Sequence, residues 1–244
     1  MLEIVCCSPD DCKIAAASGA NRIELCAALE LGGLTPSLGI VEESLAVCNL
    51  PIIVMIRPRA GGFLYTEAEF TACLRDAEHV FAAGAAGIVF GFLTPDGELD
   101  VLRTKAMIDL AAGKDTVMHG AFDVIFDQLA AMDTLIELGL TRILTSGGAP
   151  TAMEGLDRLK NLHQNARGQI ELLPRGGLTA GDIPALRAAT GFTQFHIAPF
   201  EFVEESSCRA NPNLDFSGVS ASPNHSRPQT QGSQILEAVL QMQK

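Results

Sequence analysis

The chain has 244 residues, of which 48% are hydrophobic, and this length and composition suit one α/β barrel with a large core. Its 17 basic and 29 acidic residues give a net charge of -12, which argues against nucleic acid as a partner because phosphate neutralisation requires clusters of Lys and Arg. A small anion is still compatible with this charge, because backbone amides and one or two arginines can outweigh it at a local site.

The sequence predicts a soluble, cytoplasmic protein with no membrane partner. The first residues, MLEIVCCSPDD, lack the basic and apolar segments of a signal peptide. The longest weakly polar run, residues 80–93, is shorter than the roughly 20 residues that a helix needs to cross a bilayer. The seven cysteines form no Cys-x-x-Cys pair, so we expect free thiols in a reducing compartment, most of them buried.

Eight apolar runs, each followed by a helical pattern, predict the strands of a parallel sheet. In chain order these runs are residues 2–7, 22–27, 51–57, 87–93, 115–121, 141–146, 169–174 and 193–198. Helix starts are indicated by Ser8 followed by Pro9, and by capping boxes at Thr66/Glu69 and Thr151/Glu154. Eight strand–helix units predict a TIM (β/α)8 barrel. A doubly wound open sheet is the alternative, and the polar groups at nearly every strand end favour the barrel.

The C-terminal part differs from the rest in composition. Residues 200–234 are rich in Ser, Asn, Pro and Gln and show little periodicity, which predicts an irregular arm or loop. Residues 235–244 predict a closing helix. The whole chain, residues 1–244, is therefore expected to form a single barrel domain.

Polar side chains gather at the predicted carboxyl ends of the strands, where barrels build their sites. Burying so many ionisable groups is costly unless they pair or bind a ligand. A layer of ion pairs between Glu24 and Arg22 or Arg57 is one interpretation, and a ligand site is the other. Glu3 and Glu171 lie inside the first and seventh strands, where they are candidates to point into the barrel.

Catalytic candidates, if the protein is an enzyme, are His119, Glu24 and Asp123. A histidine at a strand end is suited to general acid–base work because its pKa lies near neutrality. Glu24 or Asp123 would move protons together with it. The alternative for His119, and equally for His196, is a core histidine with satisfied hydrogen bonds.

Paired glycines follow the sixth and seventh strands and indicate a site for an anion. Such loops expose backbone amides that can cradle a phosphate, although tight turns require glycine as well. The predicted ligand-binding set for a small anionic or phosphorylated compound is Arg57, Arg59, Ser146, Gly147, Arg175, Gly176, Gly177 and His196.

Three cysteines are candidate metal ligands. The ends of neighbouring parallel strands lie within about 5 Å of each other, so a thiol after the first strand and one after the second can form a two-sulfur site. Thiolates are soft ligands and select Cu(I). Cys6 and Cys7 are adjacent and point to opposite faces, so only one of them can join Cys26 inside the barrel.

Several stretches together resemble the CutC family of copper homeostasis proteins. They are RIELCAALELGGLTPS, VMIRPRAGGFLY, GIVFGFLTPDGELD, HGAFD and RILTSGG, and the resemblance spans about residues 2–200. It implies a TIM barrel, a cytosolic location, a homodimer or higher homo-oligomer, and Cu(I) ligands among the cysteines near the first two strands. Cys26 matches the second-strand cysteine of the family, and Arg57, Arg59 and His119 match its motifs.

The sequence departs from the family pattern at several positions. The family usually has an arginine after the fifth-strand histidine and a glycine at the position of Arg175, whereas this chain has Gly120 and Arg175. It also lacks the acid that usually follows the Arg-Pro-Arg motif. We therefore expect Arg175 to restore the positive charge that is lost at Gly120.

Three functions follow from these observations. The first is copper homeostasis by cytosolic Cu(I) binding through Cys26 with Cys6 or Cys7. The second is a barrel enzyme of unknown reaction acting on a small anionic or phosphorylated metabolite. The third is an assembly role through residues 200–234.

Overall fold

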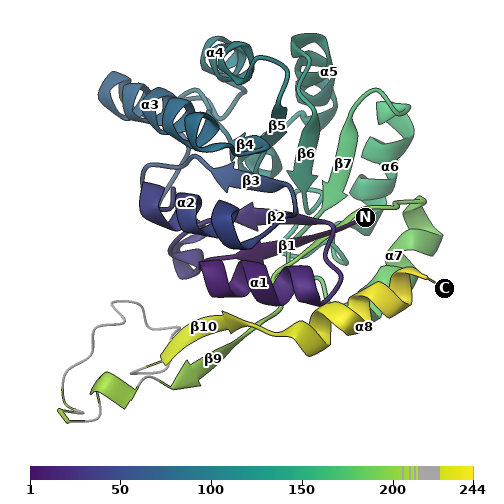
Figure 1. Ribbon diagram of the computed structural model, residues 1–244. Coiled ribbons are helices and arrows are strands. Elements are labelled where there is room, and N and C mark those ends of the chain that lie inside the picture. The colour runs from purple at the N-terminus through teal and green to yellow at the C-terminus, as the bar shows by residue number, and fades with distance from the viewer. Residues whose placement is uncertain (205, 209, 212, 214–225, 244) are drawn as a thin grey trace.

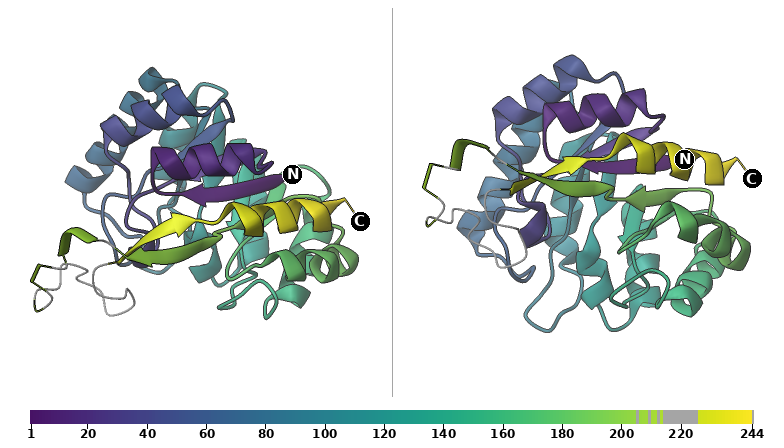
Figure 2. Two further views of the ribbon diagram at one scale, coloured as in Figure 1. Left: turned by 60° about the horizontal axis from the view of Figure 1, so that its bottom comes forward. Right: turned by 90° about the horizontal axis from the view of Figure 1, so that it is seen from below.

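The computed structural model describes residues 1–204, 206–208, 210–211, 213 and 226–243. Eight parallel strands form a nearly closed barrel with helices around it, as predicted (Figures 1 and 2). The strands are β1 (Leu2–Cys6), β2 (Arg22–Leu25), β3 (Ile52–Met55), β4 (Gly87–Phe90), β5 (Asp115–Met118), β6 (Arg142–Thr145), β7 (Glu171–Pro174) and β8 (Phe195–Ile197). The helices are α1 (Pro9–Ala17), α2 (Leu38–Val47), α3 (Glu67–Ala83), α4 (Val101–Ala111), α5 (Gln128–Leu138), α6 (Leu156–Ala166), α7 (Ile183–Thr190) and α8 (Gly232–Met242).

The strand order is β7-β6-β5-β4-β3-β2-β1-β8, and β7 and β8 lie side by side where the barrel closes. Each strand falls inside its predicted range, and most ranges extend past the strand into the loop at its carboxyl end. No helix in the described part of the chain is long and apolar enough to span a bilayer.

The predicted helix starts are confirmed for α1 and α3. Ser8 caps α1 by accepting a hydrogen bond from the amide of Asp11, and Thr66 and Glu69 form a complete capping box on α3. The pair Thr151/Glu154 forms only a turn, and α6 begins later, at Leu156. The physical reason is that the Glu154 carboxylate accepts from the hydroxyl of Thr151 instead of from its backbone amide, so the capping box is incomplete.

Alternate residues of each strand face different cores. Ile4 and Cys6 of β1 pack between the barrel and the helices, whereas Val5 packs inside the barrel with Cys26 and Met55. This alternation is the two-residue period of a strand. It places the odd-numbered residues of β1 and the even-numbered residues of β2 on the inside.

Charged side chains fill the barrel at the amino ends of the strands. Arg22 donates a hydrogen bond to Glu3, so its partner is Glu3 rather than the predicted Glu24. Arg142 donates to Glu171, with 2.7 Å between Nε and Oε2, and also lies 3.2 Å from Asp115. Both arginines are almost completely buried. We call these five residues the floor layer, because they fill the end of the barrel opposite the polar strand ends.

The C-terminal arm is more regular than predicted. Strand β9 (Phe200–Glu204) pairs antiparallel with β10 (Ser226–Thr230), and the resulting ribbon extends away from the barrel in Figure 1, before α8. The amide of Thr230 donates to Asp11 of α1 at 2.9 Å, which ties the ribbon to the barrel. Residues 214–225 of the predicted arm lie outside the described residues. The predicted closing helix is present as α8 and starts three residues earlier.

Candidate functional site

A cavity of about 320 Å³ lies at the carboxyl ends of the strands. Eight of the predicted site residues line it, namely Glu24, Cys26, Arg57, His119, Arg175, Gly176, Gly177 and His196. The volume is at the lower end of the range typical of ligand pockets, so the cavity fits a molecule of metabolite size.

The two thiols that come together are those of Cys7 and Cys26. Their sulfur atoms are 3.8 Å apart, and Cys7 is partly exposed whereas Cys26 is fully buried. The hydrogen bond with Cys7, together with burial, raises the pKa of the Cys26 thiol. Cys6 instead packs outside the barrel against Cys12, and this hydrogen bond and burial raise its pKa. The structure therefore brings Cys7, and not Cys6, next to Cys26.

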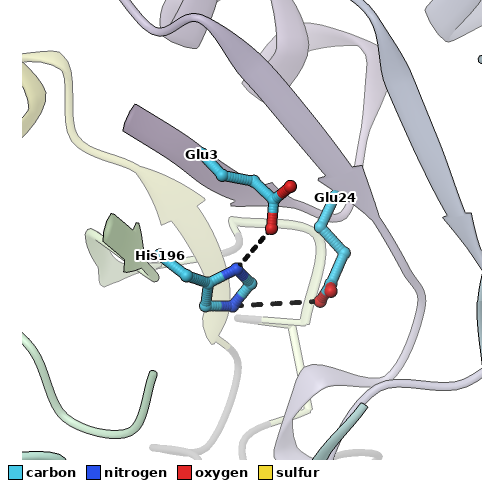
Figure 3. Close-up of side chains that lie close together, drawn as sticks. All are labelled: Glu3, Glu24 and His196. Carbon is cyan, nitrogen blue, oxygen red and sulfur yellow. Dashed lines mark hydrogen bonds and ion pairs between the residues drawn. The ribbon is translucent and has the colours of Figure 1, made fainter. Parts of the chain in front are cut away.

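Glu3, Glu24 and His196 point toward one another from β1, β2 and β8 (Figure 3). Nδ1 of His196 is 2.8 Å from Oε1 of Glu3, and Nε2 is 4.0 Å from Oε1 of Glu24. Burial alone would raise the pKa of Glu3, but the hydrogen bond from His196 and the charges of His196 and Arg22 lower this pKa to about 2. Burial raises the pKa of Glu24, outweighing the opposing charge of His196.

This arrangement gives the three residues different positions relative to the cavity. Glu24 and His196 line it. Glu3, a member of the floor layer, lies behind His196 and also accepts a hydrogen bond from Arg22. Glu3 thus fixes the imidazole ring and leaves Nε2 on the side of Glu24. A carboxylate behind a histidine commonly has this orienting role.

Arg57 shapes the rim of the cavity from within. Its guanidinium donates to the carbonyl oxygens of Leu31, Gly33 and Gly61 at 2.8–3.0 Å. These bonds join the loop after β2 to the loop after β3. The guanidinium lies in the cavity wall, and its Nη atoms donate to backbone carbonyls.

Arg59 does not line the cavity. It forms an ion pair with Glu69, with 2.5 Å between Nε and Oε1, and its guanidinium stacks on Tyr65. This predicted ligand-binding residue therefore lies in the β3–α3 loop, where it pairs with Glu69 of α3 outside the cavity.

His119 is buried and lines the cavity. Its Nδ1 accepts a hydrogen bond from the amide of Ala121 at 3.1 Å. Burial and the charges of Arg57 and Arg175 lower the pKa of His119 to about 3, so the ring is neutral at pH 7. Since Nδ1 is the acceptor, the proton lies on Nε2. This atom has no hydrogen-bond partner among the described residues.

Asp123, a predicted catalytic residue, is not among the residues lining the cavity. Its Oδ1 accepts hydrogen bonds from the hydroxyl of Thr145 at 2.6 Å and from the amides of Ser146 and Gly148 at 3.0 Å. The hydroxyl of Ser146 is bonded to Ala149, and the amide of Gly147 donates to Thr145. The amides of this loop are therefore used internally, and Ser146 and Gly147 lie outside the cavity.

The loop after β7 differs from the loop after β6 because its glycines line the cavity. Gly176 and Gly177 line the cavity with positive φ angles of 93° and 65°, which an L side chain rarely adopts. No hydrogen bond is recorded from either amide to the described part of the chain. Of the two glycine pairs predicted from the sequence, only this one lines the cavity.

Met55 and Phe63 are among the lining residues that were not predicted. Met55 contacts the same region as Cys26, since a Cβ on Gly33 would lie 3.3 Å from Cε of Met55 and 3.5 Å from Sγ of Cys26. Phe63 packs on His119, with 5.0 Å between ring centroids. The signal for Met55 was its position two residues before Arg57, which places both on the same face of the chain.

The arrangement of these residues can be compared with known proteins. The model of the CutC family matches residues 1–200. The chain belongs to the CutC family. It is 44% identical over 225 residues to a CutC family protein of Treponema denticola, covering 92% of each chain. It is 38% identical over 196 residues to the human copper homeostasis protein cutC homolog, covering 80% of this chain and 72% of the human one.

A solved CutC structure, from Streptococcus agalactiae, has a TM-score of 0.76 and 32% identity, and the match covers 80% of this chain and 97% of that one. Membership confirms the resemblance seen in the sequence. The match to the CutC family ends where β9 begins, so every cavity residue lies inside it, whereas the ribbon and α8 follow it.

The departure from the CutC pattern at residue 120 has a structural counterpart. The guanidinium of Arg175 lies against Gly120, because a Cβ built there would be 2.5 Å from Nη2 of Arg175. Arg175 also lines the cavity and lies 3.5 Å from Asp123. The guanidinium is thus in the mouth, as the hypothesis of a replaced charge requires.

Proposed function

We propose that the protein binds Cu(I) in the barrel mouth through the thiolates of Cys7 and Cys26, and that this binding is its role in copper homeostasis. The observation that carries the proposal is the 3.8 Å separation of the two sulfur atoms. Thiolates and thioethers are the soft ligands that Cu(I) prefers, and Met55 lies on the same side of the cavity. The names of the human and mouse relatives support the same role.

Access to this sulfur pair also fits a bound ion. Cys7 is partly exposed and packs against the inner core beside Cys26, and Cys26 itself lines the cavity. An ion that enters the cavity would therefore reach Cys26 from the mouth, with the sulfur of Cys7 3.8 Å from that of Cys26. The surrounding side chains Val5, Leu29 and Met55 are apolar, which protects a thiolate-bound soft ion from water.

The test is a competition titration with Cu(I) against a strong chelator, under reducing and oxygen-free conditions. Wild-type protein should bind one equivalent. Cys7→Ser and Cys26→Ser each remove a proposed copper ligand. The loss of a residue that only supports a ligand costs about 10–100-fold in metal affinity, so each of these variants should lose more Cu(I) affinity than that. Cys6→Ser and Cys48→Ser are matched controls, since both remove a buried thiol elsewhere, and they should retain binding. Equal losses in all four variants, or no loss in any, would reject the thiol pair as the site.

The alternative function is a barrel enzyme acting on a small anionic or phosphorylated molecule. It is favoured by the position of Glu24 and His196, which both line the cavity, with 4.0 Å between Oε1 of Glu24 and Nε2 of His196. His119 would act there as a neutral hydrogen-bond donor. Cu(I) binding through the thiols should be indifferent to His119→Asn, whereas an enzyme should lose activity with it.

We also propose a cytosolic location and a homo-oligomeric state, both from the family resemblance. Sedimentation of the purified full chain tests the second of these directly. A single species with the mass of one chain at micromolar concentration would contradict it.

A further inference from the structure

One wall of the cavity is made of hydrogen-bond donors that follow two strands, β5 and β7, on either side of β6. Arg175, Gly176 and Gly177 come from the loop after β7, and His119 comes from the end of β5. Arg175 reaches across to the β5 side, where its guanidinium lies on Gly120, the residue next to His119. These donors therefore border one volume although they lie 56 or more residues apart in the chain.

His119 contributes a donor that lacks a partner. Its Nε2 is buried, carries the ring proton, and has no hydrogen bond within the described residues. An unpaired buried donor costs free energy, so a ligand acceptor at this point would be stabilising. The neutral ring also avoids a conflict with Arg57 and Arg175, because a protonated ring would be a third cation and both would repel it.

The loop after β7 adds positive charge and two amides. The Arg175 side chain is 38% exposed and lines the cavity, and its Nε lies 3.5 Å from Oδ2 of Asp123. The amides of Gly176 and Gly177 are unpaired in the described chain. The glycine loop after β6 provides a contrast, since Asp123 accepts from its amides and leaves none for a ligand.

We propose that this wall binds the phosphate group of a small organic phosphate monoester, between Arg175, His119 and the amides of Gly176 and Gly177. Donors from a guanidinium, an imidazole and a glycine loop suit an oxyanion with several acceptor oxygens. Loops late in a barrel are a common location for phosphate. The proposal does not depend on copper binding, and it gives the alternative function a substrate class.

The net charge of the chain helps to interpret a binding measurement. At -12, the molecule repels anions in general, so saturable binding of phosphate reports a local site. The small cavity also limits the ester to metabolite size.

The experiment is calorimetric titration of the full chain with glycerol phosphate and with inorganic phosphate, at constant ionic strength, with malonate as the dicarboxylate comparison. We expect one saturable site for the phosphates. Arg175→Gln and His119→Asn should each weaken it by about tenfold or more, since a bond to a charged group is lost. Asn keeps an acceptor for the amide of Ala121 while it removes Nε2–H, so His119→Asn preserves the local fold.

Arg75→Gln is the matched control, because Arg75 is exposed on α3 and does not line the cavity. It should bind as wild type does. Absence of saturable phosphate binding, tighter binding of malonate than of either phosphate, or equal weakening by Arg75→Gln would overturn the proposal. Cu(I) titration of Arg175→Gln separates the two proposals, since thiol-bound copper should be unaffected by this change.

Discussion

The guanidinium of Arg175 occupies the place where a side chain at residue 120 would begin, with 2.5 Å between Nη2 and a Cβ built on Gly120. We expect this guanidinium, on the residue that follows β7, to replace the positive charge that the resemblance to the CutC pattern places after the β5 histidine. The two positions are coupled, because a side chain at one excludes the guanidinium of the other.

This coupling predicts a rescue. Arg175→Gln should weaken glycerol phosphate binding. The double variant Arg175→Gln/Gly120→Arg should bind glycerol phosphate about tenfold more tightly than Arg175→Gln alone, because the new guanidinium enters the space that Arg175 leaves. Calorimetric titration of the single and double variants measures the recovery. Gly120→Arg in the wild-type background is the control and should not tighten binding, since the space is filled.

A second prediction concerns Glu3. Glu3→Gln removes the carboxylate that pairs with buried Arg22 and His196, and we expect a loss of about 3 kcal/mol in the free energy of unfolding. Denaturant unfolding at pH 7 measures it. Glu171→Gln is the control, because Glu171 is 44% exposed and its ion pair should contribute less than about 1 kcal/mol.

The same residue predicts a pH dependence. The pKa of Glu3 is lowered from 4.5 to about 2 in the folded state, so its stabilising contribution is present above pH 4.5 and is lost as the pH falls toward 2. The charged groups that face it are His196, Arg22, Glu24 and Arg142. Wild type should therefore lose more stability than Glu3→Gln between pH 4.5 and pH 2. Parallel curves for the two proteins would contradict this.

Asp123 should act as a structural residue of the β6 loop. Asp123→Asn replaces one acceptor oxygen by an amide group that opposes the donors of Thr145, Ser146 and Gly148, and we expect a loss of about 2 kcal/mol. Hydrogen exchange at residues 146–148 should accelerate. Asp127→Asn is the control, because Asn caps α5 as well as Asp does. Unchanged exchange in Asp123→Asn would show that the loop does not depend on this carboxylate.

Arg57→Lys should loosen the rim while keeping the charge. An ammonium cannot reproduce the planar set of bonds to Leu31, Gly33 and Gly61, so stability should fall by about 2 kcal/mol and exchange at residues 29–35 should rise. Arg59→Lys, two residues away, should leave the unfolding midpoint nearly unchanged because Arg59 is at the surface. A similar effect of both variants would contradict the assigned role of Arg57.

Met55→Leu should weaken Cu(I) binding by about tenfold without changing its stoichiometry, because a soft thioether next to Cys26 is replaced by a hydrocarbon of similar volume. Met107→Leu, buried on α4 in the outer core, should have no effect on the titration. If both variants bind copper as wild type does, Met55 packs beside the site and is not a copper ligand.

The eight strands could be predicted from the sequence because each is a short apolar run bounded by helix signals. The choice between Cys6 and Cys7 was left open, although the predicted inward position of Glu3 on β1 was a signal, because the two-residue period puts Cys7 on the same side as Glu3. Once Val5 is known to face inward, the two-residue period assigns Cys7 to the same side.

The roles of the loop residues were harder to predict. Asp123 and Gly147 have the residue types of a phosphate or proton-transfer site, yet Asp123 accepts bonds from a loop 22–25 residues further along the chain. Which amides are free depends on such contacts, and sequence spacing does not report them. The ribbon was missed for a similar reason, because its strands pair across a long polar segment, although the alternation of Phe200 and Phe202 was a local signal.

The floor layer gives the barrel a single entrance. Buried Arg22 and Arg142 with their carboxylate partners fill the amino end, so whatever occupies the mouth arrives and departs on the side of the strand-end loops. Two occupants would therefore exchange in sequence, and the one nearer the rim would delay the escape of the one below it. The dissociation rate of a ligand bound deeper in the cavity would consequently depend on whether the entrance is occupied, as well as on the affinity of that ligand.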